Sequence, residues 1–332
     1  MDEMIYDLNG AKRSFSRIGF ALAAILVVGM VTQVAISAVI LVFFGSNSSV
    51  LSSSWVMWLL SFLPLYLVAI PVGLLILRRL PAQAPEEHRL GFGNAVVFFL
   101  ISVFIMYTGS IIGTLLSMVL SGGEATNATA ELAMNNHPLK VLFMVILAPV
   151  LEEFVFRKQL IDRTRRYGEK TAVMLSAVTF GLLHQNLFQF FYAFGLGLLL
   201  AYIYLRTGRL RYSAILHAII NFMGSVLAPW VLNLVDQEAL LAMESSLPTD
   251  ETLVQYMDVL PGLLVMSGYM MLLMGMFIAG LVLFIIKCRR LVWRESEAQL
   301  PRGTALRTVY CNGGMVLYML VCLIMIVFSL FA

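Results

Sequence analysis

The stretch LKVLFMVILAPVLEEFVFR, residues 139–157, decides how this chain folds. It is apolar over nearly the length of a membrane helix, and it ends on two adjacent carboxylates and an arginine. A charge at such a depth costs several kcal/mol unless it is paired or in contact with water. These charged side chains are therefore candidates for a functional site inside a membrane.

Helical spacing gives the two carboxylates different neighbours. Glu153 and Arg157 are four residues apart, so they share a helix face and can form an ion pair. Glu152 points about 100° away from Glu153, and Arg157 cannot readily neutralise both carboxylates. The spacing predicts a structural role for Glu153 and leaves Glu152 facing another part of the molecule.

The composition identifies an integral membrane protein. Of the 332 residues, 60% are hydrophobic and only 12% are charged, and the mean hydropathy is +0.90. A soluble protein of this length would carry roughly 25% charged residues. The net charge of +3 is spread over short loops, which indicates no nucleic-acid partner. The three cysteines suggest neither a disulfide framework nor a metal site.

Nine apolar runs can each span a bilayer, at roughly 20 residues per helix. They lie at 18–44, 55–77, 94–120, 138–158, 170–185, 187–206, 212–234, 260–287 and 313–331. No internal repeat, low-complexity tract or soluble domain interrupts them. The prediction is an all-α, polytopic membrane helix bundle that forms a single domain, 1–332.

The placement of Lys and Arg supports nine spans. If the spans alternate, 21 of the 22 basic residues fall on one side of the membrane, and Lys140 is the single exception. The positive-inside rule then places the N-terminus in the cytoplasm and the C-terminus outside. The longest outer loop, 236–258, is acidic and contains no Lys or Arg.

Two histidines lie on apolar helices close to these carboxylates. We expect helix four to end near Gly168, and Glu152 and His184 each lie sixteen residues from that turn. In an antiparallel helix pair, equal distance from the turn means roughly equal depth. The carboxylate and the imidazole can therefore meet, and Phe180, one turn before His184, can pack beside the ring.

His217 enters the membrane on the seventh run, with Asn221 on the same helix face. A carboxylate such as Glu152 can take a proton from water, and a histidine can orient that water or protonate a leaving amine. His and Asn side chains can donate hydrogen bonds to a developing oxyanion, worth about 3 kcal/mol per donor. Each residue alone could be a packing residue, but the set on three helices favours a hydrolytic site.

Three motifs carry a resemblance to a known family. They are Glu-Glu-x-x-x-Arg at 152–157, Phe-x-x-x-His at 180–184 and His-x-x-x-Asn at 217–221. Their order and spacing resemble those of the CPBP intramembrane proteases, which include the type II CAAX prenyl endopeptidases, the Abi proteins and bacteriocin-processing or self-immunity proteins. The resemblance covers about 138–230, helices four to seven, as a catalytic core between flanking membrane helices at 18–120 and 260–331.

The resemblance implies a role for each motif residue. Glu152 would activate the attacking water, which His184 would help to hold, and His217 and Asn221 would stabilise the oxyanion. The supporting residues would be Glu153, Arg157 and Phe180. The resemblance also implies a cell-membrane protein whose site opens to the cytoplasmic side, and a peptide or membrane-protein substrate with or without a lipid.

Two questions stay open at this stage. Glu152, His184 and His217 would make a plausible zinc set, but an Asn four residues after His217 suits an oxyanion hole better, so we expect no metal cofactor. Two other functions also fit buried charges: a proton-coupled transporter, and a non-catalytic bacteriocin self-immunity protein. The absence of an internal repeat counts against transport.

Overall fold

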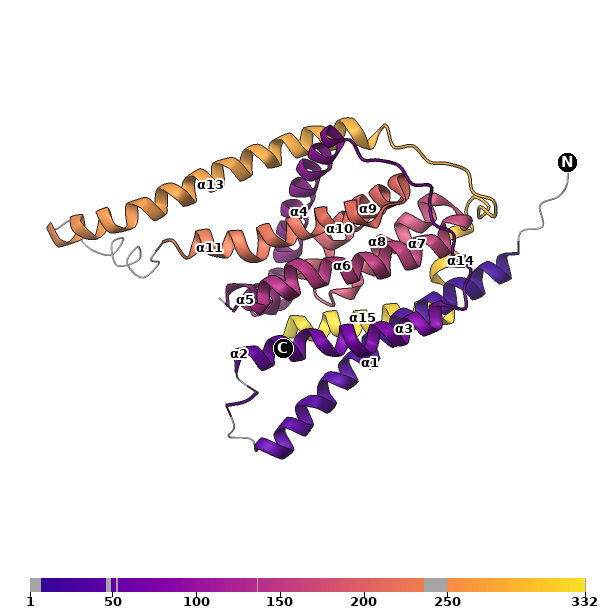
Figure 1. The fold of residues 1–332 in the computed structure, drawn as a ribbon, viewed down its shortest axis with the longest axis horizontal. Helices are drawn as coiled ribbons and strands as arrows, with labels where there is room; N and C mark the ends of the chain where they lie inside the picture. The colour runs from indigo at the N-terminus through magenta and orange to yellow at the C-terminus, as the bar shows by residue number, and fades with distance from the viewer. Residues whose placement is uncertain (1–6, 46–48, 52, 136, 236–249, 332) are drawn as a thin grey trace.

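Every regular element of the described chain is a helix, as predicted (Figure 1). The computed structural model describes residues 7–45, 49–51, 53–135, 137–235 and 250–331. Of the predicted acidic loop 236–258, residues 236–249 lie outside those ranges.

The helices follow the apolar runs of the sequence. Their bounds are α1 (Leu8–Phe44), α2 (Ser54–Leu63), η1 (Pro64–Ala69), α3 (Ile70–Leu77), α4 (Phe92–Ser121), α5 (Ala128–Met134), η2 (Val141–Leu147), α6 (Ala148–Glu153), η3 (Phe154–Gln159), α7 (Leu160–Thr164), η4 (Arg165–Tyr167), α8 (Glu169–Leu183), α9 (Leu187–Thr207), α10 (Leu210–Phe222), η5 (Met223–Leu227), α11 (Ala228–Leu232), α13 (Asp250–Cys288), α14 (Ala305–Tyr310) and α15 (Gly313–Phe331). Segments η1, η2, η3 and η5 are π-helical and continue the α-helices beside them, whereas η4 is a 3₁₀ turn.

Seven helices in the described ranges are long and apolar enough to cross a membrane. The predicted spans 138–158 and 170–185 are not among them. Helix α8 has 15 residues, about 22 Å, which is shorter than a bilayer core. The helix from η2 to α7 carries several charges close together. Nine spans and the orientation of the termini therefore remain predictions.

The two charged or short helices lie in the middle of the molecule. Helix α8 packs against α9, and α6 packs against α10. On one side lie α1, α3 and α15, and on the other side α4 packs on α9 and carries α13 (Figure 1). The apolar outer helices therefore separate the polar side chains of the central helices from the surroundings.

The α8–α9 contact needs a glycine. A Cβ atom on Gly197 of α9 would lie 2.9 Å from the Cα of Ala177 on α8, closer than side chains approach backbone. The same Cβ would lie 3.3 Å from the ring of Phe180. Gly197 therefore lets α9 pack closely against the part of α8 that carries Phe180 and His184.

The basic segments of the sequence meet at one end of the bundle, which we call the basic end. Backbone hydrogen bonds join the segments at 78–91, 162–170, 206–211 and 287–304 there: Gln83 N to Asp162 O (2.7 Å), His88 N to Thr207 O (2.8 Å) and Leu300 N to Tyr167 O (3.1 Å). Gly168, with φ +127°, forms the predicted turn between η4 and α8. The alternation of basic loops expected from the sequence is present in the fold.

Lys140, the exception in the charge pattern, has a local structural role. Its side chain is buried, and Nζ donates a hydrogen bond of 2.9 Å to the backbone oxygen of Ala133, in the last turn of α5. A cation at the C-terminus of a helix is favourable because the last carbonyl groups carry partial negative charge. Lys140 thus ties α5 to the start of the helix that carries the two glutamates.

Candidate active site

The helix that carries Glu152 and Glu153 is not a regular α-helix. The π-helical segments η2 and η3 stand before and after the short α6, and Pro149 lies in the first turn of α6. Proline has no N–H group and cannot complete the hydrogen-bond ladder of a helix. Wide turns of this kind are often found at functional sites. The sequence analysis expected a regular helix here and missed this irregularity.

The irregular helix leaves a backbone oxygen that a neighbouring helix satisfies. In a π-helix the oxygen of Met144 would accept from the N–H of residue 149, which is Pro149. The side-chain amide of Asn221, on α10, donates a hydrogen bond of 2.8 Å to this oxygen. Asn221 therefore connects α10 to η2, a contact that the sequence analysis did not anticipate.

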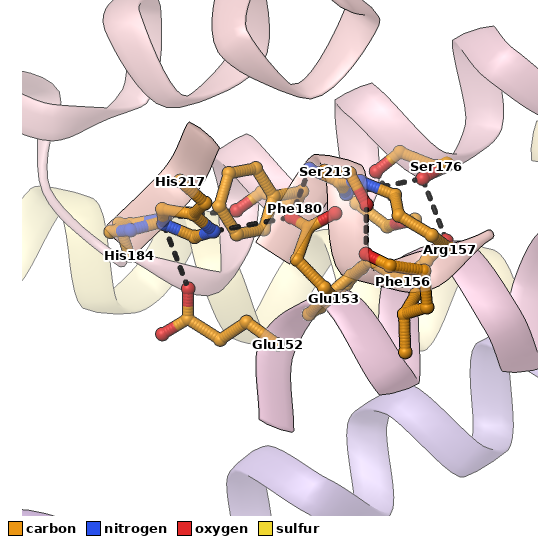
Figure 2. Close-up of polar contacts among 11 residues, drawn as sticks. Glu152, Glu153, Phe156, Arg157, Ser176, Phe180, His184, Ser213 and His217 are labelled. Carbon is orange, nitrogen blue, oxygen red and sulfur yellow. Dashed lines mark hydrogen bonds and ion pairs between the residues drawn. The ribbon is translucent and has the colours of Figure 1, made fainter. Parts of the chain in front are cut away.

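Glu153 is completely enclosed and has two partners. Its Oε1 lies 3.0 Å from Nη2 of Arg157, the ion pair that the spacing predicted. The same oxygen accepts a hydrogen bond of 3.1 Å from Nδ1 of His217 on α10 (Figure 2). Both charged side chains have an exposed fraction of 0%. This pair fixes the position of His217 relative to the central helix.

Arg157 extends the same network to α8. Its Nη1 donates a hydrogen bond of 3.3 Å to Oγ of Ser176, and that hydroxyl donates to the backbone oxygen of Phe156 at 2.7 Å. Its guanidinium carbon lies 4.6 Å from the centre of the Phe180 ring. An arginine over an aromatic face is attracted by the ring electrons. Arg157 therefore holds both η3 and Phe180 in place.

Glu152 has a different environment from its neighbour. Its side chain keeps 15% of its surface exposed, and its Oε2 lies 3.8 Å from Nε2 of His217. Because Nδ1 of His217 donates to Glu153, Nε2 is the ring nitrogen that faces Glu152 (Figure 2). His217 therefore lies between the two carboxylates, with one ring nitrogen toward each.

His184 reaches the same place from the C-terminal end of α8. Its Nδ1 donates a hydrogen bond of 3.0 Å to the backbone oxygen of Phe180. In a neutral imidazole the other ring nitrogen, Nε2, is then a hydrogen-bond acceptor. The Phe180 ring packs edge-on against His184, with centroids 5.1 Å apart, as the spacing predicted. It also packs edge-on against His217 at 5.6 Å. Phe180 is thus the common neighbour of both imidazoles.

The sequence argument paired Glu152 with His184 by depth, and the fold adds a different contact. The ion contact of Glu152 is with His217. His184 packs on the Phe180 ring, and the same ring packs on His217. Equal distance from a turn gives depth only, and it cannot give the rotation of each helix. The two motif helices nevertheless come together as the sequence predicted.

The alternative zinc set does not form a metal-binding arrangement in this fold. Among the residues that the structure describes, no group of three His, Cys, Asp or Glu side chains has the spacing to hold a metal ion. In His217 and His184, Nδ1 donates to a protein acceptor and Nε2 is the ring nitrogen left over, a pattern that zinc-binding histidines share. The three side chains as placed do not form such a group, so a metal-free site stays a prediction, and we derive no step through a metal.

Ser176 belongs to this network but was absent from the predicted site. It precedes Phe180 by four residues, as Phe180 precedes His184, so the three lie along one face of α8. That spacing was a readable signal, because a serine in this position faces the same neighbours as the Phe-x-x-x-His motif.

The fold and the site together define a multi-pass helical membrane protein with glutamate and histidine side chains enclosed by its central helices. Comparison with known proteins shows which family its central segment resembles. Residues 134–223, which contain all seven predicted site residues, match the family described as type II CAAX prenyl endopeptidase Rce1-like. A Bacillus subtilis (strain 168) protein named "Putative membrane peptidase YdiL" is 27% identical over 164 residues, which cover 47% of this chain and 66% of that relative. No solved structure matches.

These two matches confirm the resemblance to the CPBP family that the motifs indicated. They support a membrane protease at the level of the family, independently of the geometry described above. The match spans 66% of the length of this relative. The segment that matches the family, residues 134–223, contains the central helices of the present chain.

Proposed function

We propose that this chain is an intramembrane endopeptidase that uses Glu152 to activate a water molecule. Its substrate is a peptide or a membrane-associated protein, with or without a lipid. The observation that carries the proposal is the contrast between the two carboxylates. Glu153 already neutralises Arg157, so Glu152 is not needed for pairing, and it stays partly exposed beside His217.

The proposed reaction begins with the water. The Glu152 carboxylate takes a proton from it, and the resulting hydroxide attacks the carbonyl carbon of the scissile bond. Nε2 of His184 remains available to hold the water, because Nδ1 is bound to the oxygen of Phe180. The proton taken by Glu152 then passes to the leaving amine as the tetrahedral intermediate breaks down.

The oxyanion needs donors on the opposite side of the carbonyl carbon. We assign this role to Nε2 of His217 and to the amide of Asn221, which has two N–H groups and uses one on Met144 O. Because Nδ1 of His217 already donates to Glu153, Nε2 can donate as well only in the doubly protonated imidazolium, the form that the two flanking carboxylates favour in this proposal. The family resemblance supports the assignment, and the fixed position of His217 against Glu153 suits it. In this proposal the reaction is metal-free, and the site opens to the cytoplasmic side of a cell membrane.

Replacing Glu152 by Gln tests the proposal. Removing a general base typically costs 10²- to 10⁴-fold in rate, and we expect a loss of about that size. The readout is comparative peptidomics of cells with no protein, wild type or Glu152→Gln, followed by cleavage of the identified peptide by purified protein. Glu124→Gln, an exposed carboxylate outside the site, is the matched control. Undiminished processing by Glu152→Gln would refute the assignment.

A further inference from the structure

A small pocket lies against Glu152, on the side of the central helix that faces α1 and α3. Its free volume is about 10 Å³, which is room for about one water-sized group. Four of its lining residues come from outside the matched segment 134–223: Ile25 on α1, Leu65 and Tyr66 on η1, and Ile70 on α3. One wall of this pocket is therefore built by helices that the motifs do not describe.

The opposite wall belongs to the candidate active site. It consists of Glu152 itself, Val155 and Phe156 one turn later, and Leu183, the residue before His184. Because the surface of the pocket is entirely apolar, Glu152 lines it with the hydrocarbon part of its side chain, and the pocket lies beside the residue that would activate the water. A substrate whose scissile carbonyl lay at Glu152 would have a neighbouring side chain within reach of this space.

The lining restricts what can occupy the pocket. Apart from Glu152 and Tyr66, all the lining side chains are aliphatic or aromatic hydrocarbons. A charged or amide side chain would lose its hydration here without gaining enough partners. The pocket has room for about one water molecule, and a methyl group is of about that size. A long lipid chain is therefore too large for it.

Two contacts fix the outer wall. Gly73 of α3 packs directly on Ile25, where a Cβ on the glycine would lie 2.4 Å from Cγ1 of the isoleucine. Tyr66 is held by Phe62, with ring centroids 5.7 Å apart, and Phe62 in turn stacks on Phe143 at 5.0 Å. The pocket is accordingly a packed feature of the fold, and Ile25 and Leu65 are two aliphatic side chains of its outer wall that can be shortened.

We propose that this pocket is a specificity subsite, which accepts a small apolar side chain, of the size of alanine, next to the scissile bond. This inference rests on the proposed endopeptidase function and adds a substrate class to it. Helices α1 and α3 then select the substrate, while the motif-bearing helices perform the reaction. A larger pocket would admit a larger residue.

The test uses the purified full-length protein in nanodiscs and a peptide library derived from a proteome, with cleavage sites read by mass spectrometry. The variants are Ile25→Ala and Leu65→Ala, which enlarge the pocket. The matched control is Ile18→Ala, which truncates another buried isoleucine of α1 that does not line it. Glu152→Gln reports on the proposed function itself, and Ile25→Val supplies a milder truncation for use if Ile25→Ala fails to fold.

We expect the wild type to enrich alanine at one position beside the cleaved bond. Ile25→Ala and Leu65→Ala should admit valine and leucine there, with cleavage of such peptides rising by about 10-fold or more. Ile18→Ala should keep the wild-type preference. Identical preferences for wild type and both pocket variants, with Glu152→Gln inactive, would overturn the subsite and leave the proposed function standing. Cleavage by Glu152→Gln at the wild-type rate would overturn the proposed function and the subsite with it.

Discussion

Two sides of one helix differ sharply in this molecule. On the Glu153 side, the carboxylate, Arg157 and Ser176 are all enclosed and connected by hydrogen bonds and an ion pair. On the Glu152 side, the side chain is partly exposed, and its hydrocarbon part borders a small apolar pocket. Adjacent and chemically identical residues therefore have different surroundings, because one helical step separates a packed interface from a cavity.

His217 links the two sides. Its Nδ1 is fixed by Glu153, and its Nε2 faces Glu152 at 3.8 Å. A ring anchored at one nitrogen presents the other in a defined direction, which a mechanism based on precise placement requires. The enclosed side thus serves as the support for the open side, and variants of each side should separate stability from activity.

The largest effect on stability should come from breaking the enclosed pair. Arg157→Met leaves the Glu153 carboxylate buried and uncompensated, which typically costs about 3–5 kcal/mol. We expect a large fall in the unfolding midpoint, measured in detergent, whereas Glu152→Gln should unfold near the wild type. The control is Lys158→Met, since Lys158 is 46% exposed and its contact with Asp162 spans 3.7 Å. Equal stability of Arg157→Met and the control would show that the pair is not structural.

Asn221 is a residue at which a structural role, the hydrogen bond to Met144 O, can be separated from the proposed role in the reaction. Asn221→Ala leaves Met144 O without its donor, which should cost about 1–3 kcal/mol of stability. Loss of an oxyanion donor should also lower the cleavage rate per folded molecule by about 10²- to 10³-fold. Ser225→Ala, one turn later on the same helix, is the control for stability. An unstable but fully active Asn221→Ala would limit this residue to its contact with Met144.

A smaller effect is expected at the edge of the enclosed network. Ser176→Ala removes the hydrogen bonds to Arg157 and to the oxygen of Phe156, each worth about 1 kcal/mol net. The unfolding midpoint should fall moderately, and the cleavage rate should change little because Ser176 does not face Glu152. Ser61→Ala, an exposed serine that bonds only within its own helix turn, should have less effect. A loss of cleavage as large as that of Glu152→Gln would place Ser176 in the reaction instead.

No effect is expected from metal removal. Treatment of the purified protein with 1,10-phenanthroline and EDTA should leave cleavage unchanged, because the proposed reaction relies on Glu152 and two imidazoles that do not form a metal-binding group. The measurement is the cleavage rate before and after dialysis, together with metal analysis of the protein. Inactivation that added zinc reverses would favour the alternative in which Glu152, His184 and His217 bind the metal.

Local features of the site could be read from the chain. The Glu153–Arg157 pair depends on a four-residue spacing within one helix, and Phe180 packs on His184 for the same reason. The turn at Gly168 follows from the apolar runs and the residue type. The meeting of the basic segments at one end also follows from their alternation along the chain. These features need no information about how helices are rotated against one another.

Other features depend on contacts between distant segments. No spacing rule could assign Glu152 to His217 rather than His184, or direct Asn221 to the oxygen that Pro149 leaves without a donor. The pocket beside Glu152 also requires α1 and α3, which carry none of the motifs.

The sequence by itself determined an all-helical membrane protein, the candidate residues of its site and the pairing within each helix, because these follow from hydropathy and helical periodicity. Only the tertiary structure decided which imidazole lies between the two carboxylates, which backbone oxygen Asn221 satisfies and what lines the space beside Glu152. The reason is physical: periodicity fixes the direction of a side chain about its own helix axis, whereas contacts between helices depend on packing, which is settled by the whole bundle at once.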